Sequence, residues 1–335
     1  MTVQPVPILS AEHVGVTFSL RGRPLHALDD VSAEITPGRT LAVVGESGSG
    51  KSTLARVLMR AQDVRHGRVM FDGTDVTALS ERALRPFRRR VQMVFQDPYA
   101  SLDPRMTVGQ IIGEPLRAQR LASGERLRER VGDLLRMVGL PAEAAARRPG
   151  QFSGGQRQRV AIARALAPDP DVLIADEPVS ALDVSIQAQI VNLLREVQRA
   201  RHNAMMVISH DLALVYHLAD HVMVMYLGRV VESAPCDDII GNPQHPYTAA
   251  LLSATPTLDG RGERERIVLR DGPPSPLNRP SGCAFHTRCP IAQPRCSAEV
   301  PQLVPAAGGR SVACFYPGKL AGRTMADLTI QGEPT

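Results

Sequence analysis

The sequence predicts an α/β fold with a mostly parallel central sheet, and three observations carry this prediction. Short apolar runs rich in Val and Ile, such as residues 40–44 and 172–176, alternate with stretches of helical periodicity, such as residues 184–201. A glycine-rich segment stands directly between the first of these runs and a helix. The composition, with 43% hydrophobic and 22% charged residues, is that of a globular protein rather than a disordered one.

The first part of the chain predicts strands around a single helix. Residues 8–20 and 31–45 are rich in Val, Ile and Thr and predict short strands separated by the turn sequence RGRP. Helical spacing follows Lys51, and residues 69–96 predict further strands around a basic helix. We expect the strands outside the central sheet to form an antiparallel β subdomain.

The middle of the chain predicts a helical block. Residues 107–150 have helical spacing, and they interrupt the strand pattern, so we expect an inserted helical subdomain over about residues 97–155. A helix over 155–166 follows. Beyond the helix at 184–201, AMMVISH predicts another buried strand and HVMVMYLGRVVES a hairpin.

Composition changes near residue 255, where a segment rich in Arg, Pro and Gly leads into a cysteine-containing tail. We therefore expect two domains, with residues 1–255 forming the α/β unit and residues 256–335 a small C-terminal extension. Residues 321–335 are expected to be loosely ordered.

Charge and hydropathy narrow the class of protein. The formal charge of +5 is mild, and the basic cluster at residues 85–90 is typical of a solvated helix face, so we expect no nucleic-acid partner. No apolar run approaches the roughly 20 residues of a membrane-spanning helix. The N-terminus lacks the pattern of a signal peptide, so we expect a cytosolic chain whose membrane association is through partners.

Residues 45–53, with the sequence GESGSGKST, lie between an apolar run and a helix. The pattern G-x-x-x-x-G-K-[ST] in this context binds nucleotide phosphates, because glycines let backbone amides turn inward and the helix N-terminus adds partial positive charge. Lys51 would neutralise the β- and γ-phosphates, and Ser52 would bind Mg²⁺. A plain glycine turn is the alternative, but the Lys-Ser pair in this position favours the phosphate loop. The candidate residues are Gly45, Glu46, Ser47, Gly48, Ser49, Gly50, Lys51, Ser52 and Thr53.

Two adjacent acidic residues, Asp176 and Glu177, end the predicted strand VLIAD. Asp176 can hold Mg²⁺, and Glu177 is placed to polarise an attacking water as a general base. Such acids can instead cap the next helix, but the presence of a phosphate loop favours the catalytic interpretation.

A second candidate anion site is the segment FSGGQRQRVAIARAL, which starts at Phe152. Ser153, Gly154, Gly155 and Gln156 open a predicted helix, whose N-terminus attracts anions. Ser153 could equally be no more than the helix N-cap. Because this helix is not the one that follows the phosphate loop, one chain need not bring both sites to one phosphate.

These motifs, together with SALD at residues 180–183 and ISH ending at His210, resemble the ATPase subunits of ABC transporters over roughly residues 8–235. The resemblance implies a P-loop ABC ATPase fold, with residues 1–255 as the nucleotide-binding domain, and hydrolysis of ATP with Mg²⁺. Two such domains pair head to tail in this family. Each ATP then lies between the phosphate loop of one chain and residues 153–156 of the other.

The same resemblance assigns roles to single residues. It implies that Phe18 stacks on adenine, that Gln96 contacts Mg²⁺ or water and faces the membrane subunits, and that His210 contacts the γ-phosphate. Ser180 to Asp183 resemble the D-loop, which adds Asp183 to the nucleotide site. Without the resemblance, Phe18 would be an apolar strand residue and His210 a structural histidine.

The segments NPQHPYTAALLSATP and PPSPLNRPSGCAFHTRCPIAQPRC resemble the extension of oligopeptide/dipeptide import ATPases. This resemblance implies two membrane permeases, a second ATPase subunit and an extracytoplasmic solute-binding protein as partners. It implies a peripheral position on the cytoplasmic side of the cell membrane. Relatives with this tail also carry nickel or glutathione, so another small solute is an alternative cargo. A soluble ABC ATPase and an exporter are rival classes, but this chain has neither the paired cassettes nor the membrane spans typical of them.

Four cysteines, Cys283, Cys289, Cys296 and Cys314, follow the Pro-rich segment. Four thiolates can hold one metal centre and stabilise a region with little core of its own. They lack the close C-x₂₋₄-C pairs of structural zinc sites, whereas an iron–sulfur cluster tolerates irregular spacing. Relatives with a similar tail can hold a [4Fe–4S] cluster, so the resemblance favours such a cluster as a structural clip, with zinc or four unrelated thiols as alternatives. Cys236 is expected to be a buried or half-buried thiol, and His286 a surface residue or a stand-in ligand.

Overall fold

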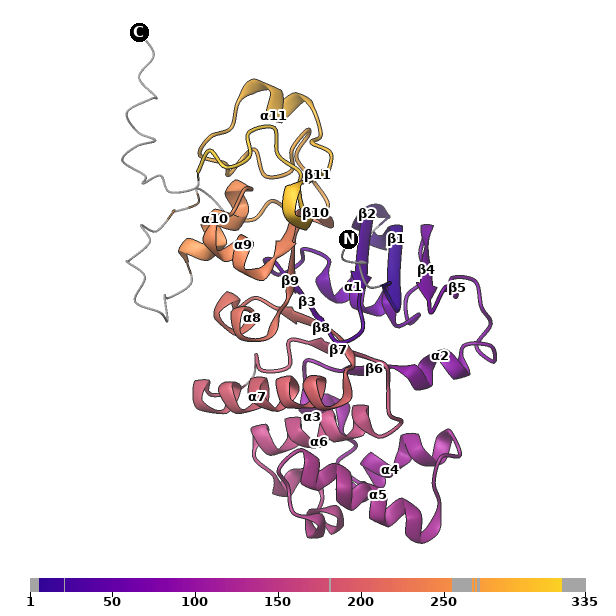
Figure 1. Cartoon of the computed structure of the whole chain (residues 1–335). Coiled ribbons are helices and arrows are strands. Elements are labelled where there is room, and N and C mark those ends of the chain that lie inside the picture. The colour runs from indigo at the N-terminus through magenta and orange to yellow at the C-terminus, as the bar shows by residue number, and fades with distance from the viewer. Residues whose placement is uncertain are drawn as a thin grey trace.

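The computed structural model of the chain describes residues 6–20, 22–180, 182–254, 267, 269 and 272–320. Within this part, two sheets are stacked above a group of helices, as Figure 1 shows. The four-stranded sheet has the order β2-β1-β4-β5, and the eight-stranded sheet has the order β11-β12-β10-β9-β3-β8-β7-β6. The predicted α/β fold class is confirmed.

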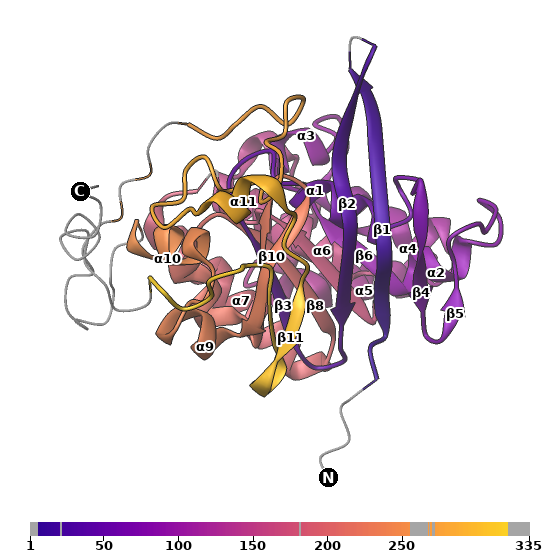
Figure 2. The same cartoon turned by 90° about the horizontal axis from the view of Figure 1, so that it is seen from above.

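The four-stranded sheet is antiparallel, as predicted. Its strands are β1 (Leu9–Leu20), β2 (Arg23–Ile35), β4 (His66–Phe71) and β5 (Thr74–Asp75). Strands β1 and β2 form a long hairpin that projects from the rest of the molecule (Figure 2).

The prediction of one strand over 31–45 is wrong, because β2 begins at Arg23 and ends at Ile35, and β3 belongs to the other sheet. Pro37 and Gly38 separate the two strands, and Gly38 has a φ of 68°. Proline cannot donate to a ladder and a left-handed residue ends an extended run, so the chain turns there.

The central sheet is mainly parallel. Strands β3 (Thr40–Val44), β6 (Val91–Val94), β7 (Val172–Asp176), β8 (Ala204–Ser209) and β9 (His221–Tyr226) pair in parallel. The predicted hairpin is present, since β10 (Arg229–Pro235) pairs antiparallel with β9. Parallel strands end at one edge, so the segments that follow β3, β7 and β8 meet there.

Helices cover both faces of this sheet and form a tier below it (Figure 1). In the lower tier, α4 (Val108–Ala118), α5 (Gly124–Met137) and α6 (Gly154–Leu166) share one core with Val94 and Leu173 of the sheet. The helices predicted over 107–150 are present as α4 and α5, followed by two 3₁₀ turns. The bounds are α1 Lys51–Leu58, α2 Arg85–Arg90, α3 Pro98–Ser101, α4 Val108–Ala118, α5 Gly124–Met137, η1 Ala142–Ala146, η2 Pro149–Gln151, α6 Gly154–Leu166, α7 Val184–Arg201, α8 Leu212–Leu218, α9 Cys236–Gly241 and α10 Pro246–Ser253.

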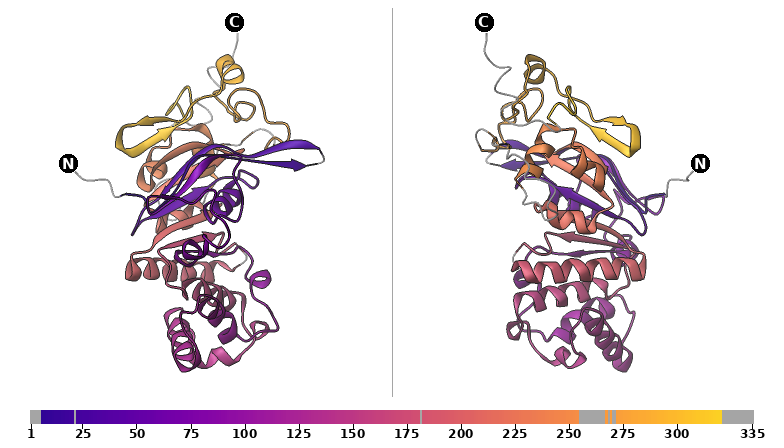
Figure 3. Two further views of the ribbon diagram at one scale, coloured as in Figure 1. Left: turned by 90° about the vertical axis from the view of Figure 1, so that its right-hand side faces the viewer. Right: turned by 60° about the vertical axis from the view of Figure 1, so that its left-hand side comes forward.

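The C-terminal segment packs onto the opposite end from the helical tier (Figure 3). It contains α11 (Pro294–Ala298), the turn η3 (Ala307–Gly309), and the strands β11 (Val304–Ala306) and β12 (Arg310–Val312). Strand β12 pairs with β10, so this segment extends the central sheet. The boundary predicted near residue 255 and the loose order predicted for 321–335 lie outside the described residues. No helix in the described ranges is both long and apolar enough to cross a membrane.

Candidate active site

The loop between β3 and α1 can adopt its shape only because two positions carry glycine. Gly45 has a φ of 151° and Gly50 a φ of 103°, values that side chains disfavour. A Cβ atom at Gly45 would lie 2.2 Å from the carbonyl oxygen of Met225. One at Gly50 would lie 2.5 Å from the carbonyl oxygen of Ala27. The neighbouring backbone therefore approaches the loop too closely for any other residue.

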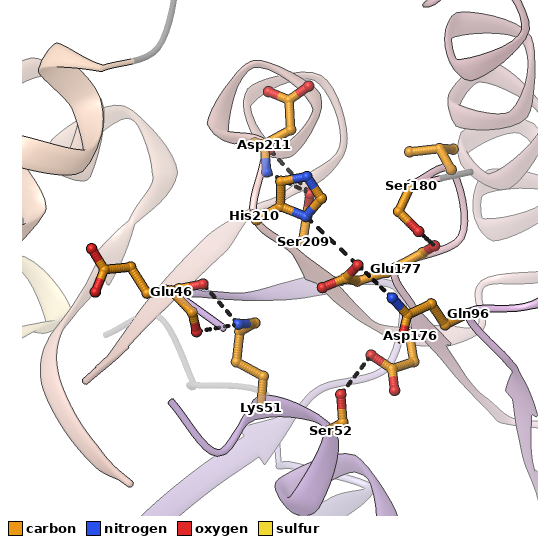
Figure 4. A network of polar contacts seen from close by, with 12 residues as sticks. Glu46, Lys51, Ser52, Gln96, Asp176, Glu177, Ser180, Ser209, His210 and Asp211 are labelled. Carbon is orange, nitrogen blue, oxygen red and sulfur yellow. Dashed lines mark hydrogen bonds and ion pairs between the residues drawn. The ribbon is translucent and has the colours of Figure 1, made fainter. Parts of the chain in front are cut away.

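Lys51 is buried under this loop, with 5% of its surface exposed. Its Nζ donates to the carbonyl oxygens of Gly45 at 2.7 Å and Glu46 at 2.8 Å (Figure 4). Burial lowers the pKa of the Lys51 ammonium, although Glu177, Asp176 and Glu46 act in the opposite direction. A buried cation in a turn of backbone amides is a site for an anion such as a phosphate.

Asp176 faces Ser52 across the start of α1. The Ser52 hydroxyl donates to Oδ1 of Asp176 at 3.1 Å, and the carboxylate is 5% exposed. Burial raises the pKa of Asp176, and the nearby charge of Glu177 adds to this, while the Ser52 hydrogen bond opposes it. A hydroxyl and a desolvated carboxylate are oxygen donors that suit Mg²⁺, so this pair fits the ion that accompanies a nucleotide.

Glu177, Gln96 and His210 come together at the same edge of the sheet (Figure 4). Nε2 of Gln96 donates to Oε2 of Glu177 at 2.9 Å, and Nδ1 of His210 lies 3.6 Å from the same oxygen. The three residues come from the segments after β6, β7 and β8. The structure thus brings together the polar residues that the sequence marks as catalytic.

The residues of the SGGQ segment lie elsewhere. Ser153 caps α6: its hydroxyl accepts from the Gln156 amide at 3.3 Å, and the Gln156 side chain accepts from the Ser153 amide at 3.1 Å. Helix α6 belongs to the lower tier, whereas α1 lies beside the upper sheets (Figure 1). The two candidate anion sites therefore stand on different parts of one chain.

Three further predicted positions, Phe18, Ser180 and Asp183, lie on the surface. Phe18, on β1, is 36% exposed, so its ring has a free face. Ser180 donates its hydroxyl to the carbonyl oxygen of Glu177 at 3.2 Å, which ties the predicted D-loop to the acidic strand end. Asp183 is exposed at the N-cap of α7. Ala181, between them, lies outside the described residues.

Two residues that the sequence did not single out also contact the loop. The Tyr247 hydroxyl accepts a hydrogen bond from the Glu46 amide at 2.7 Å, and Arg288 forms two hydrogen bonds to the Glu46 carboxylate. Both residues stand in segments of the C-terminal part that were informative only by resemblance. Their distance along the chain leaves no periodic signal that could have identified them.

The four C-terminal cysteines border one small cavity, together with His245, Phe285 and His286. Burial raises the pKa of Cys283, that of Cys289 to about 12 and that of Cys314 to about 11. No group of three or more His, Cys, Asp or Glu side chains in the described ranges has the geometry to hold a metal ion. His286 is half-buried beside this cavity rather than on the open surface, and Cys236 is buried as predicted.

Comparisons with known families give two matches along the chain. Residues 28–180 match the family described as ABC transporter. Residues 231–296 match the C-terminal region of oligopeptide/dipeptide transporters.

Curated relatives are similar over most of their length. The probable peptide ABC transporter ATP-binding protein y4tS of Sinorhizobium fredii is 56% identical over 290 residues, which is 87% of this chain and 82% of the relative. The oligopeptide transport ATP-binding protein AppF of Bacillus subtilis is 50% identical over 300 residues, which is 89% of this chain and 91% of the relative.

Solved structures share the fold. The ATP-binding cassette MJ0796, a dimer in a post-hydrolysis state bound to ADP and Pi, matches with a TM-score of 0.63 at 30% identity, over 68% of this chain and 98% of that chain. The protein cbiO1 of Clostridium perfringens, part of the ABC transporter complex cbiONQ, matches with a TM-score of 0.63 at 30% identity, over 70% and 90% of the two chains.

Proposed function

The chain belongs to the ABC transporter family and carries the C-terminal region of oligopeptide/dipeptide transporters, and from this membership we propose that it is the ATPase that energises peptide import. It binds and hydrolyses ATP. One observation carries the proposal for the site: the phosphate loop, the Ser52–Asp176 pair and the Gln96–Glu177–His210 group converge at one edge of the sheet. The peptide cargo rests on the relatives and on the oligopeptide/dipeptide transporter region.

In the proposed mechanism, Lys51 would neutralise the β- and γ-phosphates, and Ser52, Asp176 and Gln96 would hold Mg²⁺, which would supply further positive charge to the phosphates. Glu177 accepts a proton from the attacking water as the bond to the γ-phosphorus forms and the bond to the leaving oxygen of ADP breaks. His210 contacts the γ-phosphate. The adenine stacks on Phe18, and residues 153–156 with Asp183 complete the site of a partner chain.

We propose that the chain works at the cytoplasmic side of the cell membrane. Its partners would be two transmembrane permeases, a second ATPase subunit and an extracytoplasmic solute-binding protein. Residues 1–255 would be the nucleotide-binding domain and residues 256–335 its extension. The support for these partners is the oligopeptide/dipeptide transporter region and the similarity to y4tS and AppF.

The substitution Glu177→Gln tests the assignment of the general base. It keeps the size of the side chain and removes the proton acceptor, so we expect the complex with its permeases to bind MgATP normally and to lose at least ~100-fold in turnover. Glu196→Gln, an exposed change on α7, is the matched control and should keep full turnover. Unchanged turnover in Glu177→Gln would remove Glu177 from this role.

We also propose that Cys283, Cys289, Cys296 and Cys314 hold an iron–sulfur cluster. The support is that all four cysteines border one cavity. Structural zinc sites usually contain close C-x₂₋₄-C pairs, which these cysteines lack, whereas a cluster tolerates irregular spacing, and this favours a cluster over zinc.

Purification without oxygen tests this proposal. We expect brown protein with iron and acid-labile sulfide, and we expect Cys289→Ser to lose both. Cys236→Ala is the matched control, because Cys236 is buried apart from the cavity, and it should keep both. Colourless wild-type protein without iron or sulfide would contradict the proposal.

A further inference from the structure

Glu46, the second residue of the phosphate loop, is held at three points. Its carbonyl oxygen accepts a hydrogen bond from Lys51 at 2.8 Å, and its amide donates to the Tyr247 hydroxyl at 2.7 Å. Its carboxylate accepts two hydrogen bonds from Arg288, at 2.8 and 2.9 Å. Tyr247 and Arg288 follow Glu46 by 201 and 242 residues, so the loop is bound by a distant part of the chain. We call Glu46, Tyr247 and Arg288 the Glu46 clamp.

The outer half of the clamp is buried in a rigid aromatic block. Tyr247 is fully buried and Arg288 is 8% exposed. The rings of Tyr226, Tyr247 and Phe285 have centroids 4.7 to 5.4 Å apart. The Arg288 guanidinium lies 6.0 Å from the Tyr226 ring centroid and donates to its hydroxyl at 3.4 Å. The clamp residues therefore cannot move independently of the C-terminal segment.

The clamp also compensates the negative charge of the Glu46 carboxylate beside the phosphate loop. The Glu46 carboxylate points away from Lys51, as Figure 4 shows, and towards the bidentate guanidinium. Without Arg288 the carboxylate would be uncompensated and free to turn towards a bound triphosphate, which it would repel. Arg288 is suited to this role, since its planar fork matches a carboxylate at two points and a lysine cannot.

We propose that Arg288 and Tyr247 are positioning residues for the phosphate loop, so that the affinity for ATP depends on the C-terminal segment, which carries Arg288, and on helix α10, which carries Tyr247. They act through Glu46, whose carbonyl in turn holds the Lys51 ammonium. The inference rests on the proposed function, because it requires ATP to bind at this loop. It adds that the segment next to Cys289 influences ATP binding through its hydrogen bonds to Glu46.

Binding of a fluorescent ATP analogue with Mg²⁺ to the full chain tests the clamp. We expect Arg288→Ala to raise Kd about tenfold and Arg288→Lys to have an intermediate effect, since it keeps the charge and loses the fork. In the complex with permeases, Arg288→Ala should raise KM while kcat changes less than about threefold, the pattern of a lost binding interaction. Arg295→Ala is the matched control: this arginine, in the same segment, pairs with Glu299 on the surface and should leave Kd unchanged.

A double-mutant cycle decides whether the pair acts as a unit. With Arg288 absent, Glu46→Gln should restore part of the lost affinity, because it removes the uncompensated charge; losses that simply add would overturn the proposal. Tyr247→Phe removes one hydroxyl without emptying the core, and a rise in Kd of about threefold is expected.

These results also separate the clamp from the proposed function. If Arg288→Ala fails to fold, Arg288→Lys and Tyr247→Phe carry the test alone. If the folded variants had a lower melting temperature but an unchanged Kd for ATP, the proposal would be overturned. Arg288 and Tyr247 would then stabilise the fold without affecting ATP binding. If the Lys51→Ala variant bound ATP with the Kd of the wild type, the proposed function would be overturned, because ATP would then bind elsewhere.

Discussion

Glu177 shows how one residue is placed for chemistry. Its φ of 45° is unusual for a side chain with a Cβ and costs about 1–3 kcal/mol. The surrounding structure enforces it, because the Glu177 amide donates to the carbonyl oxygen of Ile208 at 3.0 Å, beyond the end of the ladder between β7 and β8. The chain turns sharply after β7, and the carboxylate is thereby directed towards Gln96 and His210.

Lys51 and Asp176 form the electrostatic core of the site. Burial lowers the pKa of the Lys51 ammonium and raises that of the Asp176 carboxyl, because desolvation disfavours the charged form of each group. A magnesium nucleotide brings an anion to the buried ammonium and a cation to the buried carboxylate. The site is therefore complementary to the ion pair as a whole and not to phosphate alone.

Residues of this site were predictable from the sequence where they belong to a local motif with fixed spacing. Lys51 and Ser52 follow glycines at fixed spacing, and Asp176 and Glu177 follow an apolar run, so strand and loop patterns suffice. Arg288 and Tyr247 were not predictable in this way. Their contacts with Glu46 depend on how the last part of the chain packs against the first. Neither the periodicity nor the composition of the sequence predicts such a tertiary contact.

At the scale of elements, the bounds of α6 and α7 agree with the sequence because both starts carry a local signal. Ser153 and Gln156 form a capping box at α6, and an aspartate stands at the N-cap of α7. Strands β11 and β12 were not predicted. They are three residues each, and β11 is exposed throughout. Strand β12 pairs with β10 and β11 pairs with β12, and these pairings come from tertiary packing alone.

The contact between α6 and α7 gives a prediction about stability. A Cβ atom at Gly155 would lie 2.4 Å from Cγ2 of Ile186, so these helices pack with no room for a methyl group. We expect Gly155→Ala to destabilise the fold by about 1–3 kcal/mol, as overpacking does. Thermal unfolding of the full chain measures this.

The matched control is Gly150→Ala, because a Cβ atom there would meet no atom within 4 Å. This variant should melt within a degree or two of the wild type, since exposed changes rarely exceed about 0.5 kcal/mol. Equal melting temperatures for the two variants would show that α6 and α7 can separate freely, contrary to the packing described.

At the scale of the whole molecule, the two candidate anion sites belong to different parts of the chain. The phosphate loop lies at the edge of the central sheet, whereas Ser153 opens a helix of the lower tier (Figure 1). A single chain therefore carries two different halves of a nucleotide site, the phosphate loop and residues 153–156, and they lie in different places. Pairing two copies head to tail would join the halves, and the fold matches the cassette MJ0796, which is dimeric with ADP and Pi.

This arrangement predicts a dimer that depends on nucleotide. The Glu177→Gln chain with MgATP should sediment as a dimer, because bound ATP is not consumed and joins the two halves; with ADP it should stay a monomer, because the γ-phosphate is the group that reaches the second chain. Adding Ser153→Glu should prevent dimerisation without weakening ATP binding, because it puts a negative charge where the partner's phosphate would lie. Analytical ultracentrifugation measures both states. A dimer that forms equally well with Ser153→Glu would mean that residues 153–156 do not complete the site, and the two halves would then need another explanation.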